Sequence, residues 1–327
     1  MKFVLSGIAL ACALGAHASF DLMLLPGNDD RIYRYDPVNR LMLGSYATSG
    51  TGKIAASIAG RSYTTGGSSN LQMHNYSTGN HAGYLSSATS NRGVELCGDS
   101  VYVLSLSQLR KTVTATNSST VISLGTLIVW HTLASFGSTI VAIGTNTANQ
   151  ISFQNIDLTT FTAGSVITTS NTATVGSSLG KAAAVANPFT GTPTLIFSFV
   201  NGASVNFARV SLSTTGVVSA ASALTGALNN FSATNFMPGF SAGHAGGFWA
   251  YGQDSITATN GRVTRYDMTT SSLVQGETNT FASPGGVYTT GIFHAANVVA
   301  PEPGVFLGLG LGVVGLLRRR KRLWGRM

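Results

Sequence analysis

Short runs of alternating apolar and polar residues recur along most of the chain, and turn-forming residues separate them. The clearest run is RIYRYDPVNRLMLGSY, which spans Arg31–Tyr46. Its two halves flank Asp36-Pro37-Val38-Asn39, a combination of residue types that favours a turn. A period of two residues places apolar side chains on one face of a β-strand. The segment therefore predicts two antiparallel strands joined by a tight turn.

Similar strand–turn–strand units recur along the chain, which points to a repeat architecture. They begin at Leu71, Ser100, Gln150, Ser204 and Gly261. The equivalent turn positions are taken as Asp36, Tyr76, Ser105, Asp157, Ser211 and Asp267. Their spacings of 40, 29, 52, 54 and 56 residues suit units of four strands, as in propeller blades. Several units follow an apolar stretch, so each is expected to contain an inner strand, a connection and an outer hairpin.

The hairpins YRYDPVNR and TRYDMTTSS resemble the repeats of β-propellers of the quinoprotein and kelch-like type. The resemblance covers about residues 20–295 and implies six or seven blades. Charged residues make up only 9% of the chain, and few Glu, Lys and Gln are present to favour long helices. The expected fold class is therefore all-β, with a β-propeller as the architecture. A β-sandwich and a β-solenoid remain alternatives.

The net charge of +8 is concentrated at the two ends of the chain. Lys2 and six residues within Arg318–Arg326 supply seven of the 19 Lys and Arg residues. Apart from Glu302, ten acidic residues face the remaining 12 basic ones, so the body carries a charge close to +2. A nucleic-acid-binding protein would carry its positive charge on a folded face. We therefore expect no nucleic-acid partner, and the basic, apolar ends point to membranes and secretion.

The first residues have the pattern of a secretory signal peptide. Lys2 precedes an apolar stretch over Phe3–Ala16, and Ala16-His17-Ala18 provides an A-x-A cleavage site. Residues 1–18 are thus predicted to be removed, which leaves Ser19 as the first mature residue. An uncleaved first helix and lipidation at Cys12 are the alternatives, although Ala9 stands where a lipobox usually has Leu.

Cys97 is the only cysteine of the predicted mature chain. An intrachain disulfide is then impossible despite the oxidising compartment. No His and acid motif around Cys97 suggests a nucleophile, so we expect it to act as a small buried apolar residue.

The body shows no motif typical of catalysis, metal binding or cofactor binding. His74, His81, His131, His244 and His294 are isolated, without H-x-x-x-H or H-E-x-x-H spacing. Gly310–Gly315 matches G-x-G-x-x-G, but the chain ends at Met327, too soon for the helix and acidic residue of a dinucleotide site. We therefore predict no catalytic, metal or cofactor site, and a protein that is not an enzyme.

Two further groups of residues have both a structural and a functional interpretation. Asp36, Asp157 and Asp267 share the repeat turn, and we expect them to cap hairpins. Asp29 and Asp30 form the only adjacent acid pair of the body and are read as a turn. The aromatic pairs Phe248/Trp249 and Tyr33/Tyr35 either pack between sheets or form a surface on which sugar rings stack.

The C-terminal segment has three parts in a fixed order. Pro301-Glu302-Pro303 precedes an apolar run over Gly304–Leu317. As a helix, these 14 residues would span about 20 Å, less than the roughly 30 Å of a hydrocarbon core. Five consecutive basic residues follow, namely Arg318, Arg319, Arg320, Lys321 and Arg322. They predict a stop-transfer element whose basic end stays cytoplasmic.

These three parts together resemble the PEP-CTERM sorting signal of Gram-negative bacteria. The resemblance covers about residues 300–322 and implies recognition by an exosortase, a membrane cysteine protease of transpeptidase type. Cleavage near Pro301–Pro303 would release the body to the cell surface or to a matrix rich in exopolysaccharide. The chain is thus expected to contain a signal peptide (1–18), an all-β body (19–299) and a sorting signal (300–327) that inserts transiently in the membrane.

Three functional hypotheses follow. The first is an exported, non-enzymatic surface or matrix protein associated with polysaccharide. The second is a secreted enzyme on a propeller scaffold, such as a lyase or glycosidase, which would need clustered carboxylates or a histidine at one end of the channel. The third is a permanent inner-membrane protein anchored by its tail.

Overall fold

The computed structural model describes most of the body of the chain. The described residues are 20–25, 31–37, 39–47, 54–58, 61–65, 70–75, 78–86, 92–175, 179–219, 224–228, 231, 236–242, 247–256, 259–270, 272–282, 291–292 and 294–299. The predicted cleavage site at Ala16, Ala18 and Ser19 lies outside them, as do Asp29, Asp30 and the whole sorting signal. Among the described residues no helix has the length and apolar character needed to cross a membrane.

All regular elements of the described residues are β-strands, most of them in four-strand runs. The first part of the chain forms β1 (Phe20–Leu25), β2 (Arg31–Asp36), β3 (Leu41–Ala47), β4 (Ile54–Ile58), β5 (Arg61–Thr65), β6 (Asn70–Asn75) and β7 (His81–Ser86). The next run is β8 (Gly93–Cys97), β9 (Ser100–Leu104), β10 (Gln108–Val113) and β11 (Ser119–Ser123). It is followed by β12 (Ile128–Phe136), β13 (Thr139–Asn146), β14 (Gln150–Asp157) and β15 (Thr162–Thr172).

The second half of the body continues this organisation. It contains β16 (Ala183–Ala186), β17 (Pro193–Asn201), β18 (Ser204–Ser211) and β19 (Leu224–Ala227). The last run is β21 (Gly239–Ala242), β22 (Gly247–Gln253), β23 (Asn260–Met268) and β24 (Leu273–Ala282). The remaining strands are β20 (Phe236–Met237), β25 (Gly291–Ile292) and β26 (His294–Val299).

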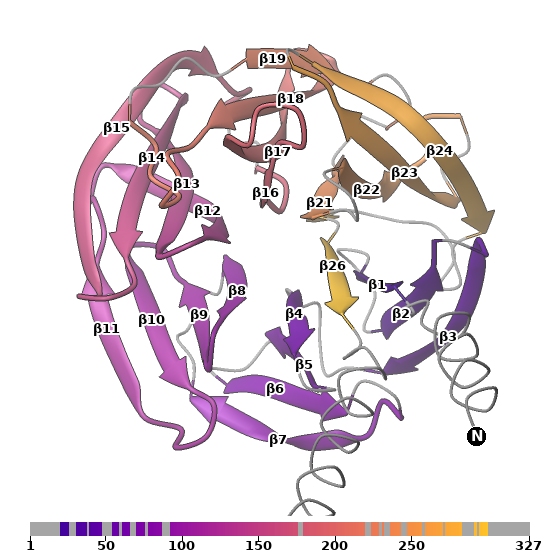
Figure 1. Ribbon diagram of the computed structural model, residues 1–327, viewed down its shortest axis with the longest axis horizontal. Helices are drawn as coiled ribbons and strands as arrows, with labels where there is room; N and C mark the ends of the chain where they lie inside the picture. Colours follow the sequence, from indigo (N-terminus) through magenta and orange to yellow (C-terminus); the bar gives the residue numbers. More distant parts are fainter. Residues whose placement is uncertain are drawn as a thin grey trace, which may run out of the picture. The chain divides into compact units, whose positions relative to one another are not determined.

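Within Asp21–Val298 the sheets are arranged radially, as in a β-propeller (Figure 1). The strands β4, β8, β12, β16, β21 and β26 lie nearest the centre, and β3, β7, β11, β15, β19 and β24 lie at the rim. Contacts join β4 to β8, β8 to β12, β12 to β16, and β16 to β21. The expected all-β propeller is confirmed, rather than a β-sandwich or β-solenoid.

The number of sheets differs from the six or seven blades expected. Among the described strands, hydrogen bonding defines five sheets of four or more strands, and one of them has eight. The eight-stranded sheet has the order β3-β2-β1-β26-β4-β5-β6-β7. Its two halves meet where β26 and β4 run parallel, at the pair Val298 and Ser57. The first and last parts of the chain therefore share one sheet, which the spacing of the repeats did not indicate.

Tyr76 lies outside the described residues; of the other predicted repeat turns, all but one lie where a run's third strand connects to its outer strand. Asp36, Asp157 and Ser211 end β2, β14 and β18, and Asp267 lies near the end of β23. Ser105, by contrast, follows β9, the second strand of its run. The equivalent position there is Val113, at the end of β10. This correction changes the spacings of 29 and 52 residues to 37 and 44, which makes the repeat more regular.

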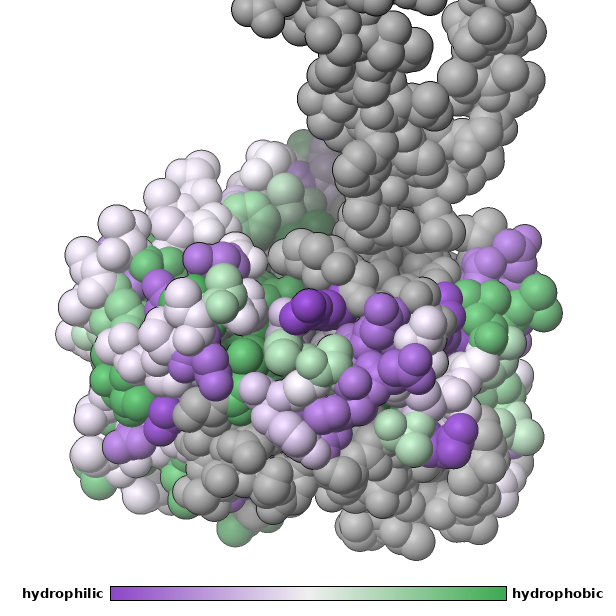
Figure 2. All heavy atoms as spheres, turned by 90° about the horizontal axis from the view of Figure 1, so that it is seen from below, coloured by the Kyte–Doolittle hydropathy of each residue, from purple (hydrophilic) through white to green (hydrophobic). Residues whose placement is uncertain are grey.

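The apolar core lies between neighbouring sheets. One cluster joins Leu71 and Leu85 to Val94 and Val101, and three similar clusters lie between the successive sheets from β8–β11 to β21–β24. Middle strands such as β9, β17 and β22 are buried on both faces and so read as nearly continuous apolar runs. Outer strands such as β11 and β15 are mostly exposed. On the face seen in Figure 2, hydrophilic, weakly polar and apolar residues are interspersed.

Candidate functional site

A largely buried ion pair connects the inner strands of three neighbouring sheets. Glu95 on β8 lies 3.6 Å from the amine of Lys181, which lies two residues before β16. Ser135 on β12 donates a hydrogen bond of 3.1 Å to the other carboxylate oxygen of Glu95. Burial raises the pKa of Glu95, while Lys181 and the Ser135 hydroxyl act in the opposite direction. The positive charge of Lys181 compensates the negative charge of Glu95, so the pair can link the sheets without leaving a buried charge unpaired.

The backbone around Lys181 extends this connection to further strands. The Lys181 carbonyl accepts a hydrogen bond of 2.9 Å from the amide of Phe240 on β21. The amide of Ala182 donates one of 3.1 Å to the Thr132 hydroxyl on β12. Lys181 and Ala182, just before β16, thus contact the sheets that contain β8, β12 and β21, and they link these sheets near the centre of the propeller.

A cavity of about 450 Å³ lies between the β4–β7 run and the β8–β11 run. We call it the Tyr63 cavity, and its lining comprises Arg61, Tyr63, Leu96, Gly98, Asp99, Thr114 and Ala115. Tyr63 and Leu96 are buried, whereas Arg61, Gly98, Asp99 and Ala115 are exposed. The cavity therefore has an apolar floor and a polar rim.

Short turns hold the rim of the Tyr63 cavity in place. Gly98 has a positive φ of 61° in the two-residue turn between β8 and β9, a conformation that favours glycine. The amide and hydroxyl of Thr114, just after β10, each donate a hydrogen bond of 2.9 Å to the Asp99 carbonyl. Burial raises the pKa of Tyr63, and a hydrogen bond with the Thr114 side chain acts against this. The two turns are thus tied together beside the floor.

Two side chains of opposite charge at this rim, Arg61 and Asp99, have no ionic partner among the described residues. Arg61 begins β5, and its guanidinium makes only a 3.9 Å contact with the sulfur of Met73 within the described residues. The carboxylate of Asp99 accepts a hydrogen bond of 2.7 Å from Ser100. In that same part of the chain neither residue forms an ion pair. Both therefore retain hydrogen-bonding capacity for a ligand.

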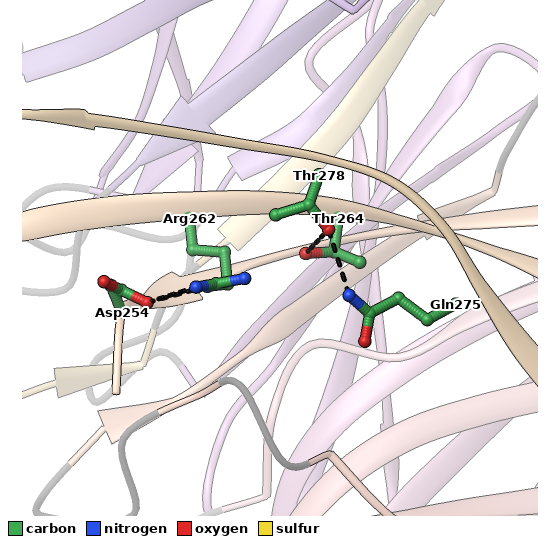
Figure 3. Close-up of polar contacts among 5 residues, drawn as sticks. All are labelled: Asp254, Arg262, Thr264, Gln275 and Thr278. Carbon is green, nitrogen blue, oxygen red and sulfur yellow. Dashed lines mark hydrogen bonds and ion pairs between the residues drawn. The ribbon is translucent and has the colours of Figure 1, made fainter. Parts of the chain in front are cut away.

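A second buried ion pair lies at the end of β22 (Figure 3). Arg262 on β23 contacts one carboxylate oxygen of Asp254 through Nε and Nη2, at 2.8 and 2.6 Å. The two side chains are only 4% and 9% exposed for Asp254 and Arg262. Beside them, Thr264, Thr278 and Gln275 form a separate chain of hydrogen bonds of 3.2 Å. Because Asp254 is buried and paired, it is not poised as an accessible acid.

Asp36, Asp157 and Asp267 were expected to cap the repeat turns, and the first two do so. Asp36 accepts hydrogen bonds from the amide and side chain of Asn39, at 3.0 and 2.7 Å. Asp157 accepts the amides of Thr159 and Thr160, which hold its pKa below the usual value. The expectation is wrong for Asp267, which pairs with Arg265 at 2.8 Å. Thr269 caps that turn instead, by accepting the Ser272 amide at 2.8 Å.

Two histidines that look unrelated in the sequence are neighbours in the structure. His74 on β6 and His81 on β7 are cross-strand partners, with ring centroids 5.7 Å apart. Tyr84 lies 4.4 Å from His81, and Tyr46 from β3 lies 5.5 Å from His74. Burial lowers the pKa of His74. Within the described residues, no group of three or more His, Cys, Asp or Glu side chains is placed to hold a metal ion.

The two aromatic pairs proposed for sugar stacking belong to the core. Phe248 and Tyr33 are almost completely buried, and Trp249 and Tyr35 are nearly so. The stacking interpretation is therefore wrong, because both faces of their strands are covered by neighbouring sheets. Cys97 is half-buried at the edge of an apolar cluster, and burial raises the pKa of its thiol.

No pattern in the sequence indicated the Tyr63 cavity or the ion pair between Glu95 and Lys181. Arg61 and Asp99 belong to different repeats, and the rest of the β8–β11 run and the whole β12–β15 run separate Glu95 from Lys181. None of the four lies in a recognisable motif. A correct alignment of the repeats, with Val113 at the turn position, would have placed Thr114 beside the β8–β9 turn.

Comparisons with known proteins define the fold and leave the family open. No family model matches the chain, and no curated protein matches it. A protein chain of the nidogen/laminin complex has a TM-score of 0.56 and 10% identity, over 85% of this chain and 98% of that one. A protein of unknown function from Bacteroides caccae has a TM-score of 0.55 and 8% identity, over 86% and 100%.

The WD40 domain of coronin from Toxoplasma gondii is a further structural relative. It has a TM-score of 0.50 and 8% identity, over 77% of this chain and 65% of that chain. Identities this low carry no information on ligand or activity. The radial sheets and these structural similarities show that the chain is an all-β protein with a β-propeller arrangement.

Proposed function

We propose that this protein is an exported, non-enzymatic component of the cell surface or extracellular matrix. The observation that carries the proposal is the order of features at its ends. A signal-type segment stands at residues 1–18, and Pro301-Glu302-Pro303, an apolar run and Arg318–Arg322 stand at the other end. An exosortase is the proposed processing partner, and the apolar run is the proposed transient membrane helix.

The placement of the carboxylates supports a role in binding rather than catalysis. Glu95 and Asp254 are each buried against a basic side chain. Asp157 lies in a turn, and Glu277 lies on an outer strand, 3.7 Å from Arg40. A glycosidase needs two carboxyl groups facing one substrate bond, at separations of roughly 5–10 Å. These four carboxylates are distributed over three runs of strands, and each has its own partner.

Association with polysaccharide is supported by the character of the rim strands. β15 carries exposed Thr and Ser side chains along most of its length, and β11 has a similar composition. Such a surface offers many hydroxyl groups and few fixed charges to a hydrated polymer. We therefore propose exopolysaccharide as the surroundings of the released body.

We also propose that the eight-stranded sheet counts as two blades, which gives six in all. The runs β26-β1-β2-β3 and β4-β5-β6-β7 each have the four-strand length of the other sheets. A single residue pair joins them in the described register. In this arrangement the last strand of the body completes the first blade.

Intact mass spectrometry of the exported protein tests the proposal directly. The expected mature chain begins at Ser19 and ends near Pro301–Pro303. A mature mass that includes Met327 would instead indicate a permanent anchor. As a second arm, a variant lacking Pro301–Met327 should escape retention and processing at the envelope. Unchanged processing and surface display of that variant would contradict the proposal.

A further inference from the structure

We propose that the Tyr63 cavity binds one sugar unit of a polysaccharide, with Arg61 and Asp99 holding its hydroxyl groups. This names a ligand class for the matrix protein proposed above, and its biological setting rests on that proposed function. The volume of about 450 Å³ falls within the roughly 300–1,000 Å³ typical of small-molecule sites.

The floor and rim of the cavity match the two kinds of surface that a sugar ring presents. A pyranose has apolar C–H faces and a rim of hydroxyl groups. Leu96 and the ring of Tyr63 provide buried apolar surface at the floor. Arg61 supplies N–H donors and Asp99 supplies carboxylate acceptors at the rim. A hydroxyl group, which donates and accepts, satisfies both residue types at once.

The charges favour a neutral hydroxylated ligand over a small zwitterion. Arg61 and Asp99 are both exposed, so water and salt screen their attraction for a free ammonium or carboxylate group. Charge-assisted hydrogen bonds to hydroxyl groups depend less on long-range attraction, and they are stronger than neutral ones. Because the rim is exposed, the sugar units on either side of the bound one can remain in solvent, so the cavity can accept a unit within a longer polysaccharide.

The hydrogen bonds around Thr114 prepare the site for binding. Its amide and hydroxyl fix the Asp99 carbonyl, which restrains the turn that carries the Asp99 side chain. On the other side, Arg61 is the first residue of a paired strand, in register with Asn75. The two charged residues therefore project from restrained backbone, which lowers the entropy lost on binding.

The test is isothermal titration calorimetry of the full chain in mild detergent with cellohexaose, maltohexaose and chitohexaose. Binding of at least one probe with a dissociation constant below about 1 mM, or −4.1 kcal/mol, is expected. Arg61→Met and Asp99→Asn should each weaken that binding about tenfold, by loss of one charge-assisted hydrogen bond. Ala115→Trp should abolish it by filling the cavity from an exposed turn.

Arg31→Met is the matched control for Arg61→Met. Arg31 is also an exposed arginine at the first position of a strand, but it donates to the Ser45 hydroxyl, far from the cavity lining. Its substitution should leave affinity unchanged. Thermal melting of each variant reports folding independently of binding, and Ala115→Trp provides a second readout if Arg61→Met is unstable.

The proposal is overturned if none of the three probes binds, if Ala115→Trp binds like the wild type, or if Arg31→Met and Arg61→Met lose affinity equally. Displacement of the sugar by millimolar glycine, a zwitterion, would also overturn it. These outcomes are independent of sorting, because the purified chain is tested without processing. Conversely, a chain that binds sugar but keeps its tail would contradict the proposed function and leave the site standing.

Discussion

Glu95 and Lys181 form an ion pair from which water is largely excluded, with side chains 15% and 10% exposed. Removing one partner of such a pair leaves an uncompensated buried charge, which costs about 3–5 kcal/mol. We expect Lys181→Met to lower the free energy of unfolding by this order at pH 7. The double variant Glu95→Gln/Lys181→Met should recover most of the loss, since it buries no unpaired charge. Urea denaturation of the wild type, Lys181→Met, Glu95→Gln and the double variant measures the coupling between the two side chains.

The same pair predicts a dependence on pH. Burial already holds the pKa of Glu95 above its usual 4.5, and loss of Lys181 removes the first influence that lowers it. A carboxyl group with a raised pKa stabilises the folded state below the unfolded pKa, and this contribution is lost as pH rises through the folded pKa. The deficit of Lys181→Met should therefore be greatest at neutral pH, shrink as pH falls through the raised pKa of Glu95 in the folded state, and be smallest below about pH 4.5. A deficit that is constant with pH would contradict this account.

Asp157 gives the opposite pH dependence, because backbone amides of Thr160 and Thr159 lower its pKa below 3.8. A lowered pKa stabilises the folded state above the unfolded pKa, and this contribution disappears as pH falls through the folded value. Asp157→Ala should melt at a lower temperature than the wild type at pH 7, and the gap should close toward pH 2. Asp157→Asn, which keeps an acceptor oxygen, is the control. Equal melting of Asp157→Ala and wild type at pH 7 would show that the cap is unimportant.

The role of a residue could be predicted from the sequence when its contacts lie within a few positions along the chain. The caps at Asp36 and Asp157 bond to residues two or three positions away, and turn chemistry alone indicated them. The partner of Glu95 is distant in the chain, and only the ring of sheets brings the two together. The sequence likewise did not indicate that Arg61 and Asp99 line one cavity, since they lie in different repeats and form no ion pair within the described residues.

β3 combines an exposed apolar surface with an unpaired edge. It ends the order of the eight-stranded sheet, and Leu41 and Leu43 on one of its faces are 58% and 44% exposed. Exposed apolar edges favour association between chains. Leu43→Lys should reduce aggregation, measured by light scattering at rising concentration, without lowering the melting temperature. Val121→Lys adds the same charge to the rim strand β11, where Ser119 and Ser123 lie two positions away on either side, and should have the smaller effect.

Hairpins were the elements that the sequence predicted best. Alternation identified β2 and β3, and the turn residues located their connection. Middle strands such as β17 and β22 are apolar on both faces, so their pattern cannot distinguish a strand from a buried helix by period alone. The Ser and Thr residues after Thr168 are of types common in loops, yet they continue β15, an exposed strand, up to Thr172.

At the scale of the whole molecule, side chains from distant parts of the chain close the ring. Asn279 on β24 donates hydrogen bonds to the Tyr35 hydroxyl at 2.9 Å and to the Arg40 carbonyl at 3.3 Å. Glu277 lies 3.7 Å from Arg40, and the rings of Phe281 and Tyr35 are 5.9 Å apart. The pattern of repeats could not reveal this closure, because the strand that completes the first sheet comes from the other end of the chain.

That closing strand, β26, ends at Val299, immediately before the proposed processing site. It lies between β1 and β4 in the eight-stranded sheet, so the body needs His294–Val299 to cover the edges of both. A chain that ends at Ala300 should therefore melt at the same temperature as the full-length protein, because every strand of the sheet remains. A chain that ends at Phe293 lacks β26 and should melt at a lower temperature and be cut faster by protease. Equal melting and proteolysis of the two truncated chains would show that β26 does not close the ring. The expected difference would mean that a cut near Pro301 can remove the basic, apolar tail while leaving the propeller closed.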